Sequence, residues 1–197
     1  MSSREAILSA VKANQPGSVV LPDITVFDTE DKGSLKEFAG VLLSVGGNVF
    51  YVSNYEEITK LILEKHGPDA KIVSPLPEFK EFCDERNEPV SSPHDLYNVD
   101  VALLKAHFGV AENGAVWLTE NDMHHRALPF ICQHLAVIIN IQAIVPTMHH
   151  AYKLIDGTTY GFGTFIAGPS KTADIEQSLV IGAHGARSMT VFIMENR

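Results

Sequence analysis

Apolar positions in the first hundred residues alternate between a helical and a strand-like spacing. Residues 35–43 carry apolar side chains at i, i+3, i+4, i+7 and i+8, the stripe of an amphipathic helix, and Gly46-Gly47 ends it. Residues 48–52 then predict a strand. Asn54 is a typical N-cap for a second helix, and a short strand is expected at 71–73. This alternation is typical of βαβ units on a largely parallel sheet.

The second half of the chain is richer in predicted strands. Near-continuous apolar runs, suited to strands that are buried on both faces, occupy residues 99–104, 115–118, 135–140 and 189–194. Covering helices are expected to begin after Asn121, after Thr147 and around Ser170 to Thr172. At the start of the chain, Ser2 and Glu5 form a capping-box pattern for a short helix that we expect to pack on the core.

The connection at residues 74–98 is rich in proline and acidic side chains and has little periodicity, so it is predicted to be a long surface segment. Neither flank has the pattern of a separate core. The sequence therefore predicts an α/β protein, with a largely parallel sheet flanked by helices, in which residues 1–197 form a single domain.

Composition narrows the function classes. The net charge is −9 and there is no Lys/Arg cluster, which argues against nucleic acid because phosphate neutralisation supplies most of that affinity. No apolar run approaches the ~20 residues of a membrane span, and the charged start lacks the apolar region of a signal peptide, so we expect a cytoplasmic protein. The two cysteines, Cys83 and Cys132, are too few for the four thiolates of a usual iron–sulfur cluster.

The segment 168–176, Gly-Pro-Ser-Lys-Thr-Ala-Asp-Ile-Glu, reads as a junction between a strand and a helix. Unpaired N–H groups at such a helix start, together with Lys171 and two hydroxyls, are suited to a phosphate or a carboxylate. The alternative is that Ser170 or Thr172 only caps the helix. A nucleotide-binding Walker A loop is excluded because Pro169 occupies the position of its lysine.

Two further loops carry candidate chemistry. The segment 182–187 places His184 and Arg187 close in sequence to the first motif, and we expect both loops to line one crevice at the carboxyl ends of the strands. Glu112, on the turn Glu-Asn-Gly, is a candidate base or nucleophile, although Asn113-Gly114 is also an ordinary turn dipeptide. The histidine pairs lack metal-site spacing, so no metal site is predicted.

These motifs together resemble the LutC/YkgG-type lactate-utilization protein C family, defined by its LUD domain. The resemblance covers much of residues 100–197 and implies a NagB/RpiA/CoA-transferase-like fold. It also implies a part in the oxidation of L-lactate to pyruvate with iron–sulfur partner proteins. The clusters would then lie on the partners, with no cofactor on this chain, which would be a substrate-binding or accessory subunit. The predicted ligand-binding residues are Gly168, Ser170, Lys171, Thr172, Asp174, Glu176, His184 and Arg187.

The same fold group offers two alternatives. Glu112-Asn113-Gly114 is similar to the Glu-Asn-Gly of CoA transferases, in which the glutamate is acylated, so Glu112 is the candidate catalytic residue of an acyl-CoA transferase. A sugar-phosphate isomerase or a hydrolase of the same group rests on fold analogy alone.

Overall fold

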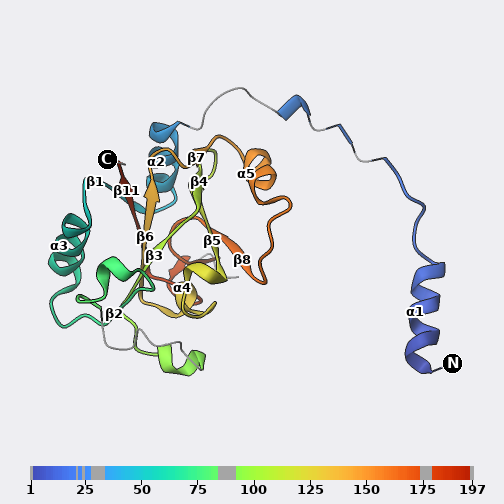
Figure 1. Cartoon of the computed structure of the whole chain (residues 1–197), viewed down its shortest axis with the longest axis horizontal. Helices are drawn as coiled ribbons and strands as arrows, with labels where there is room; N and C mark the ends of the chain where they lie inside the picture. Colours follow the sequence, from blue (N-terminus) through green and yellow to red (C-terminus); the bar gives the residue numbers. More distant parts are fainter. Residues whose placement is uncertain are drawn as a thin grey trace.

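A computed structural model describes residues 2–20, 22–23, 25–27, 34–83, 92–173 and 179–195 (Figure 1). The helices are α1 (Ser3–Ala13), α2 (Leu35–Ser44), α3 (Tyr55–His66), α4 (Leu128–Ile131) and α5 (Met148–Ile155), with 3-10 turns η1 (Thr25–Phe27), η2 (Pro77–Phe79), η3 (Pro93–Leu96) and η4 (Glu120–Asp122). The strands are β1 (Asn48–Val52), β2 (Ile72–Val73), β3 (Val101–Lys105), β4 (Phe108–Val110), β5 (Ala115–Thr119), β6 (His134–Asn140), β7 (Ile144–Val145), β8 (Gly163–Ile166), β9 (Lys171–Ala173), β10 (Leu179–Ile181) and β11 (Ser188–Met194).

The main sheet has five strands in the order β1-β11-β6-β3-β2, and every pair in it is parallel. Its central pair, β6 and β11, is in register over seven residues, from His134 opposite Ser188 to Asn140 opposite Met194. The predicted strands at 48–52, 71–73, 99–104, 135–140 and 189–194 all lie in this sheet. The predicted α/β class is confirmed.

A second sheet, in the order β7-β4-β5-β8, was not expected from the sequence. The run at 115–118, predicted as a strand of the parallel sheet, instead forms β5 and pairs antiparallel with both β4 and β8. The physical reason is the length of the connection. Only residues 111–114 separate β4 from β5, and a link this short joins antiparallel strands, whereas parallel neighbours need a long crossover.

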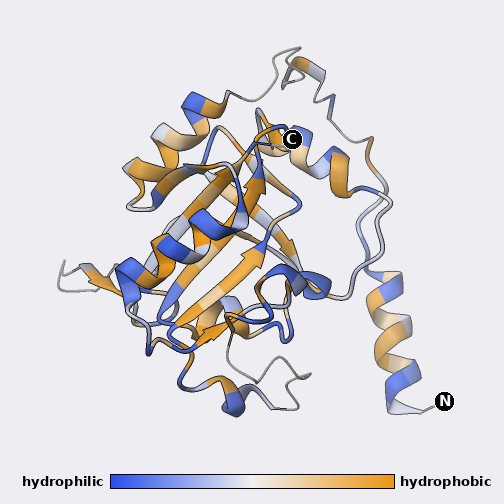
Figure 2. Ribbon diagram, turned by 60° about the vertical axis from the view of Figure 1, so that its left-hand side comes forward, coloured by the Kyte–Doolittle hydropathy of each residue, from blue (hydrophilic) through white to orange (hydrophobic). Residues whose placement is uncertain are grey.

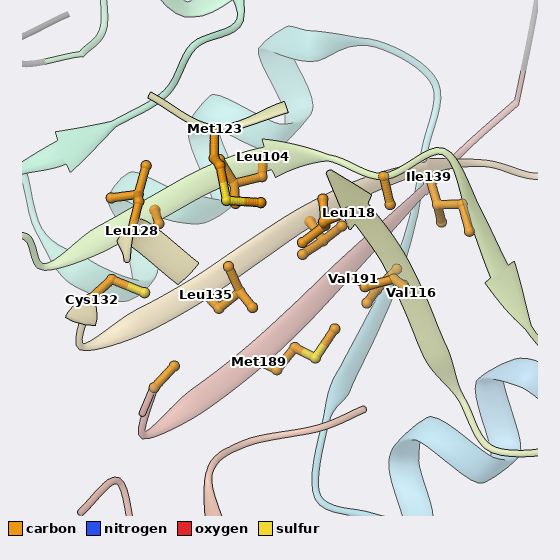
Figure 3. Packing of buried hydrophobic residues seen from close by; sticks show 14 of the residues in the cluster. Leu104, Val116, Leu118, Met123, Leu128, Cys132, Leu135, Ile139, Met189 and Val191 are labelled. Atoms are coloured by element: carbon orange, nitrogen blue, oxygen red, sulfur yellow. The ribbon is translucent and has the colours of Figure 1, made fainter. Parts of the chain in front are cut away.

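The elements form layers around the main sheet (Figures 1 and 2). α3 covers one face, where Ile58 and Ile62 pack on side chains such as Val101. α2 and the second sheet cover the other face, and Figure 3 shows Val116 and Leu118 of β5 facing the main sheet within one buried cluster. α5 lies on the outer face of the second sheet.

The predicted helix beginning at Ser170–Thr172 is wrong, because the chain forms an antiparallel hairpin there. Lys171, Thr172 and Ala173 of β9 pair with Ile181, Val180 and Leu179 of β10. β-branched side chains favour a strand, and pairing satisfies backbone groups that a single helical turn leaves unpaired. Val180 of β10 is 45% exposed, so this side chain does not pack on the core.

Two smaller expectations also need correction. The capping box at Ser2 and Glu5 is confirmed, but α1 has no buried residue and Ile7 is 63% exposed, so this helix does not pack on the core. The segment 74–98 is not purely a surface connection, since Phe79 and Leu96 are buried on 3-10 turns. In the ranges described, no helix has both the length and the apolarity needed to cross a membrane.

Candidate functional site

A crevice lies at the carboxyl ends of the central strands of the main sheet, the edge at which open α/β folds usually bind ligands. Its volume is about 460 Å³. The lining residues follow β2, end or follow β3 and β6, or belong to η4: Pro75, Leu76, Lys105, Ala106, His107, Asn121, Asp122, Asn140 and Ala143. One cation, an imidazole, a carboxylate and two amides therefore gather on one concave surface.

His107 and Asp122 form the polar centre of this crevice. Nε2 of His107 lies 2.8 Å from Oδ2 of Asp122 and 3.2 Å from Oγ1 of Thr119. The Asp122 side chain is 19% exposed and that of His107 is 48% exposed. A half-exposed imidazole whose orientation is fixed by a carboxylate is a common arrangement for proton transfer.

The backbone around His107 explains why the side chain is held there. The N–H of Ala106 donates to Ile138 O of the main sheet at 2.9 Å, and the N–H of His107 donates to Trp117 O of the second sheet at 3.0 Å. The chain therefore passes from one sheet to the other between these two residues. Since both sheets hold this connection, the imidazole is attached to a rigid part of the fold.

Asp122 is fixed by a capping box at the start of η4. Its Oδ2 accepts hydrogen bonds from the Thr119 N–H at 2.6 Å and from the Thr119 hydroxyl at 2.7 Å. The same oxygen faces His107. The Asp122 carboxylate thus caps η4 directly after β5 and also orients the imidazole of His107.

An apolar cavity of about 300 Å³ lies on the other side of His107. Phe108, Trp117, Leu154 and Tyr160 are among its lining residues, together with Thr119 and Asn121. His107 therefore borders both a polar and an apolar hollow, so a ligand in the crevice can place a polar group on the imidazole and an apolar group beside it.

The structure brings the two predicted ligand-binding loops together, at a different edge from the one expected. The N–H of Ser170 donates to Ala186 O at 2.9 Å, and the N–H of Gly182 donates to Ser170 O at 3.0 Å. However, Arg187 directly precedes β11, and its N–H donates to Gln133 O just before β6. The loops thus lie at the amino ends of these strands, and the expectation of a carboxyl-end position is wrong.

The anion-binding geometry expected for this segment is also altered. Residues 171–173 form a strand, so these residues do not present the row of unpaired N–H groups of a helix start, and the Ser170 amide is already bonded. Lys171, His184 and Arg187 are exposed and Thr172 is half-buried, whereas Asp174 and Glu176 lie outside the described residues. Ligand binding by these side chains stays a prediction.

Gly168 and Gly114 both make close backbone contacts with the end of α2. Gly168 has φ +74°, and a Cβ there would lie 2.9 Å from Val45 O. Gly114 has φ +67°, and its Cβ would lie 2.8 Å from the backbone N of Leu42. Glycine is required at both positions for conformation and for space.

Glu112 has a structural role. Its Oε1 accepts the N–H of Met148 at 2.7 Å, which satisfies an unpaired donor in the first turn of α5. Asn113 Oδ1 accepts the N–H of Ala115 at 3.0 Å, the bond of an ordinary Asx turn. The acyl-CoA transferase alternative stays a prediction.

The crevice contains residues that were not predicted from the sequence. These residues include His107 and Asp122. One signal was available, because Thr119-x-x-Asp122 is a capping-box pattern directly after a strand. The described residues contain no group of three or more His, Cys, Asp or Glu side chains arranged to hold a metal ion.

A five-stranded parallel sheet joined to a smaller mixed sheet defines an α/β protein with a carboxyl-end crevice. A model of the LUD domain family matches residues 90–194, which is more than half of the chain. The chain belongs to the LUD domain family, and the resemblance noted in its motifs is confirmed. The matched region includes His107, Asp122 and both predicted ligand-binding loops.

Individual relatives agree with this assignment. An uncharacterized protein of Neisseria meningitidis serogroup B is 23% identical, with 97% of this chain and 93% of that protein covered. The lactate utilization protein C of Geobacillus sp. (strain WCH70) is 28% identical over 72% of this chain and 69% of its own length. The lactate utilization protein C of Anoxybacillus flavithermus is 35% identical over 45% of this chain and 40% of its own length. The chain thus spans less than half of some of these relatives.

A crystal structure supports the fold. A DUF162 family protein from Deinococcus radiodurans superposes with a TM-score of 0.59, covering 81% of this chain and 95% of that one, at 21% sequence identity. At this identity the likeness shows a shared architecture.

Proposed function

We propose that this protein takes part in lactate utilization and binds a small hydroxy- or keto-carboxylate in the crevice at His107. Relatives named lactate utilization protein C support the pathway. The observation that carries the choice of site is the His107–Asp122 pair, fixed at the carboxyl ends of the parallel sheet.

The crevice offers complementary groups for such a ligand. Lys105 lines it with an exposed ammonium that pairs with a carboxylate, and Asn140 adds an amide at the end of β6. Nε2 of His107 faces Asp122, and among the described residues Nδ1 makes no hydrogen bond, so Nδ1 is available to a hydroxyl or carbonyl group. Oxidation of an α-hydroxy acid to a keto acid removes the hydroxyl proton and a hydride equivalent from Cα. Nδ1 of His107 would accept the proton, and the hydride equivalent would pass to a two-electron acceptor on the partner proteins.

We further propose that electrons pass to iron–sulfur partner proteins. Of the two cysteines, Cys132 is buried, and burial raises the pKa of its thiol to about 12, so it stays protonated at neutral pH. Thiolates are the usual cluster ligands. The protein is then a substrate-binding or accessory subunit of the system.

Complementation tests the proposed function. In a host that depends on this chain for growth on L-lactate, its deletion is expected to abolish L-lactate-dependent dye reduction while the partner proteins are retained. The wild-type gene restores activity, and His107→Asn and Lys105→Gln restore it poorly. His94→Asn, an exposed histidine that lines none of the cavities described, is the matched control. Undiminished dye reduction in the deletion strain contradicts the proposal.

The same assay separates the two candidate ligand sites. Lys171→Gln and Arg187→Gln remove the cations of the loops at the amino ends of the strands. If these variants fail whereas His107→Asn is fully active, the ligand binds at the loops and not in the crevice. Thermal shifts with L-lactate and pyruvate give an independent reading, since a ligand that binds only the folded state raises Tm.

A further inference from the structure

A separate cavity lies between α3 and the face of the main sheet that α3 covers, at the opposite end of β3 from the crevice. Val101 at the start of β3 lines this cavity, whereas Lys105 at its end lines the crevice. Its volume is about 270 Å³. The walls are mostly apolar and include Phe50, Leu61, Ile62, Val101, Leu135, Ala136 and Phe192.

Most of the polar groups that line this cavity belong to basic side chains. Nζ of Lys65 donates to Oγ1 of Thr190 at 3.2 Å, and Thr190 is only 6% exposed. The rings of His66 and His134 lie with their centroids 4.4 Å apart. Three cationic or protonatable groups from α3 and β6 therefore converge on one small hollow.

Acidic side chains near this basic cluster provide little counter-charge to it. Glu64 lines the cavity, but its side chain is 60% exposed and its Oε1 lies 3.8 Å from Lys60 Nζ. Burial lowers the pKa of both His66 and His134, Lys65 lowers both further, and Arg187 also lowers that of His134. Asp100 acts in the opposite direction but is outweighed, so the charged forms of the two imidazoles are disfavoured.

A purely structural explanation accounts for only part of the cluster. Lys65 and His66 lie in the last turn of α3, where cations favour the helix dipole. That explanation does not require the Lys65 ammonium to bond a buried hydroxyl on β11. His134 of β6 is held within the sheet, with its Nδ1 2.8 Å from Oγ of Ser188, but that bond does not require its ring to stack on His66 at the cavity.

We propose that this cavity binds a monocarboxylate with a compact apolar body, such as an aromatic or short-chain aliphatic acid. The carboxylate pairs with Lys65 and the two imidazoles, and the apolar body lies against Phe50 and Phe192. The volume is just below the about 300–1,000 Å³ typical of ligand sites, so a nucleotide or CoA is too large. This site is distinct from the crevice at His107, and Lys65 and His66 lie outside the matched family region.

This proposal is tested by titrating the full chain with benzoate and with hexanoate. Binding is measured by calorimetry and by changes in the histidine NMR signals. Benzamide and hexanamide, which keep the shape without the charge, are expected to bind at least about tenfold more weakly. Binding at pH 6 is expected to take up protons, because an anion favours the charged imidazoles. Proton uptake is measured by comparing buffers that differ in ionisation enthalpy.

Single-residue variants test whether benzoate binds in this cavity. Lys65→Met keeps the aliphatic stem and is expected to weaken benzoate roughly tenfold, as is His134→Asn. Lys60→Met, five residues earlier on α3 with a side chain 75% exposed, is the matched control and is expected to leave binding unchanged. The proposal is overturned if benzoate does not bind, if benzamide binds equally well, if Lys65→Met has no effect, or if L-lactate displaces benzoate at equal concentration. Because the readout is binding of these acids, failure here leaves the lactate proposal intact.

Discussion

Oδ2 of Asp122 accepts two hydrogen bonds from Thr119 and also lies 2.8 Å from Nε2 of His107. One carboxylate oxygen therefore caps the 3-10 turn η4, which follows β5 of the second sheet, and also orients an imidazole at the edge of the first sheet. The position of the His107 ring is thus tied to the junction of the two sheets, and a change at Asp122 acts on both.

Asp122→Asn tests whether this orientation matters for function. Asparagine keeps an oxygen for the Thr119 N–H but removes the charge that holds the imidazole. We expect L-lactate-dependent dye reduction to fall by about 10²-fold or more, in the range typical for loss of acid–base assistance. The Tm is expected to change little. Asp69→Asn, at an exposed turn after α3, is the control, and equal activity of the two variants contradicts the role of Asp122.

Gly114→Ala is expected to destabilise the fold by about 3 kcal/mol. The alanine would have to adopt the backbone angle φ +67°, and its Cβ would lie 2.8 Å from the backbone N of Leu42. Gly67→Ala separates these two effects. Gly67 has φ +85° but nothing within 4 Å of a Cβ, so only about 1 kcal/mol is expected. Gly40→Ala, within α2 and in open space, is expected to stabilise by roughly 0.5–1 kcal/mol. Denaturant unfolding measures all three, and equal losses for Gly114→Ala and Gly67→Ala would rule out the contact with Leu42.

His66 is expected to make stability depend on pH. Burial, then His134 and Lys65, lower its pKa to about 4 in the folded protein, from 6.5 in the unfolded chain. Between these values the unfolded state binds more protons, so the free energy of unfolding falls as pH is lowered from 6.5 towards 4. His66→Asn is expected to flatten the Tm profile in this window and to leave Tm above pH 7.5 nearly unchanged. An unaltered slope contradicts the burial of an uncharged His66.

Glu112→Gln and Glu112→Ala distinguish a structural from a catalytic glutamate. Gln keeps an oxygen for the Met148 N–H, so it is expected to lose less stability than Ala, for which about 1 kcal/mol is expected. A transferase nucleophile would instead lose its acyl-enzyme in both variants. Incubation with acyl-CoA followed by borohydride, read by mass spectrometry, detects that species in the wild type if it forms.

The sequence predicted the main sheet well because its strands and helices carry their signals locally. The stripe over 35–43 and the N-cap Asn54 each specify a helix within one short window, and Asn54 Oδ1 does accept the Glu57 N–H at 2.9 Å. The central strands are apolar on both faces, which is the pattern of a covered parallel sheet.

The second sheet and the site escaped prediction because both depend on pairing between distant residues. β5 has the same apolar pattern as a parallel strand, and only the short turn before it determines its direction. The segment at 171–173 has helix-start residues, yet its partner is a strand at 179–181. His107 and Asp122 are 15 positions apart and meet only because the connection between the sheets turns there.

The contacts of Gly114 and Gly168 with the end of α2 have a mechanical consequence. At both positions the atoms nearest to an added Cβ are backbone atoms, of Leu42 and Val45 respectively, so no side-chain rotation makes room there. The last turn of α2 therefore packs at backbone distance against both the Glu112 turn and the Gly168 segment. We expect a displacement of one of these two motifs to be transmitted through α2 to the other, although they are more than 50 residues apart in the sequence.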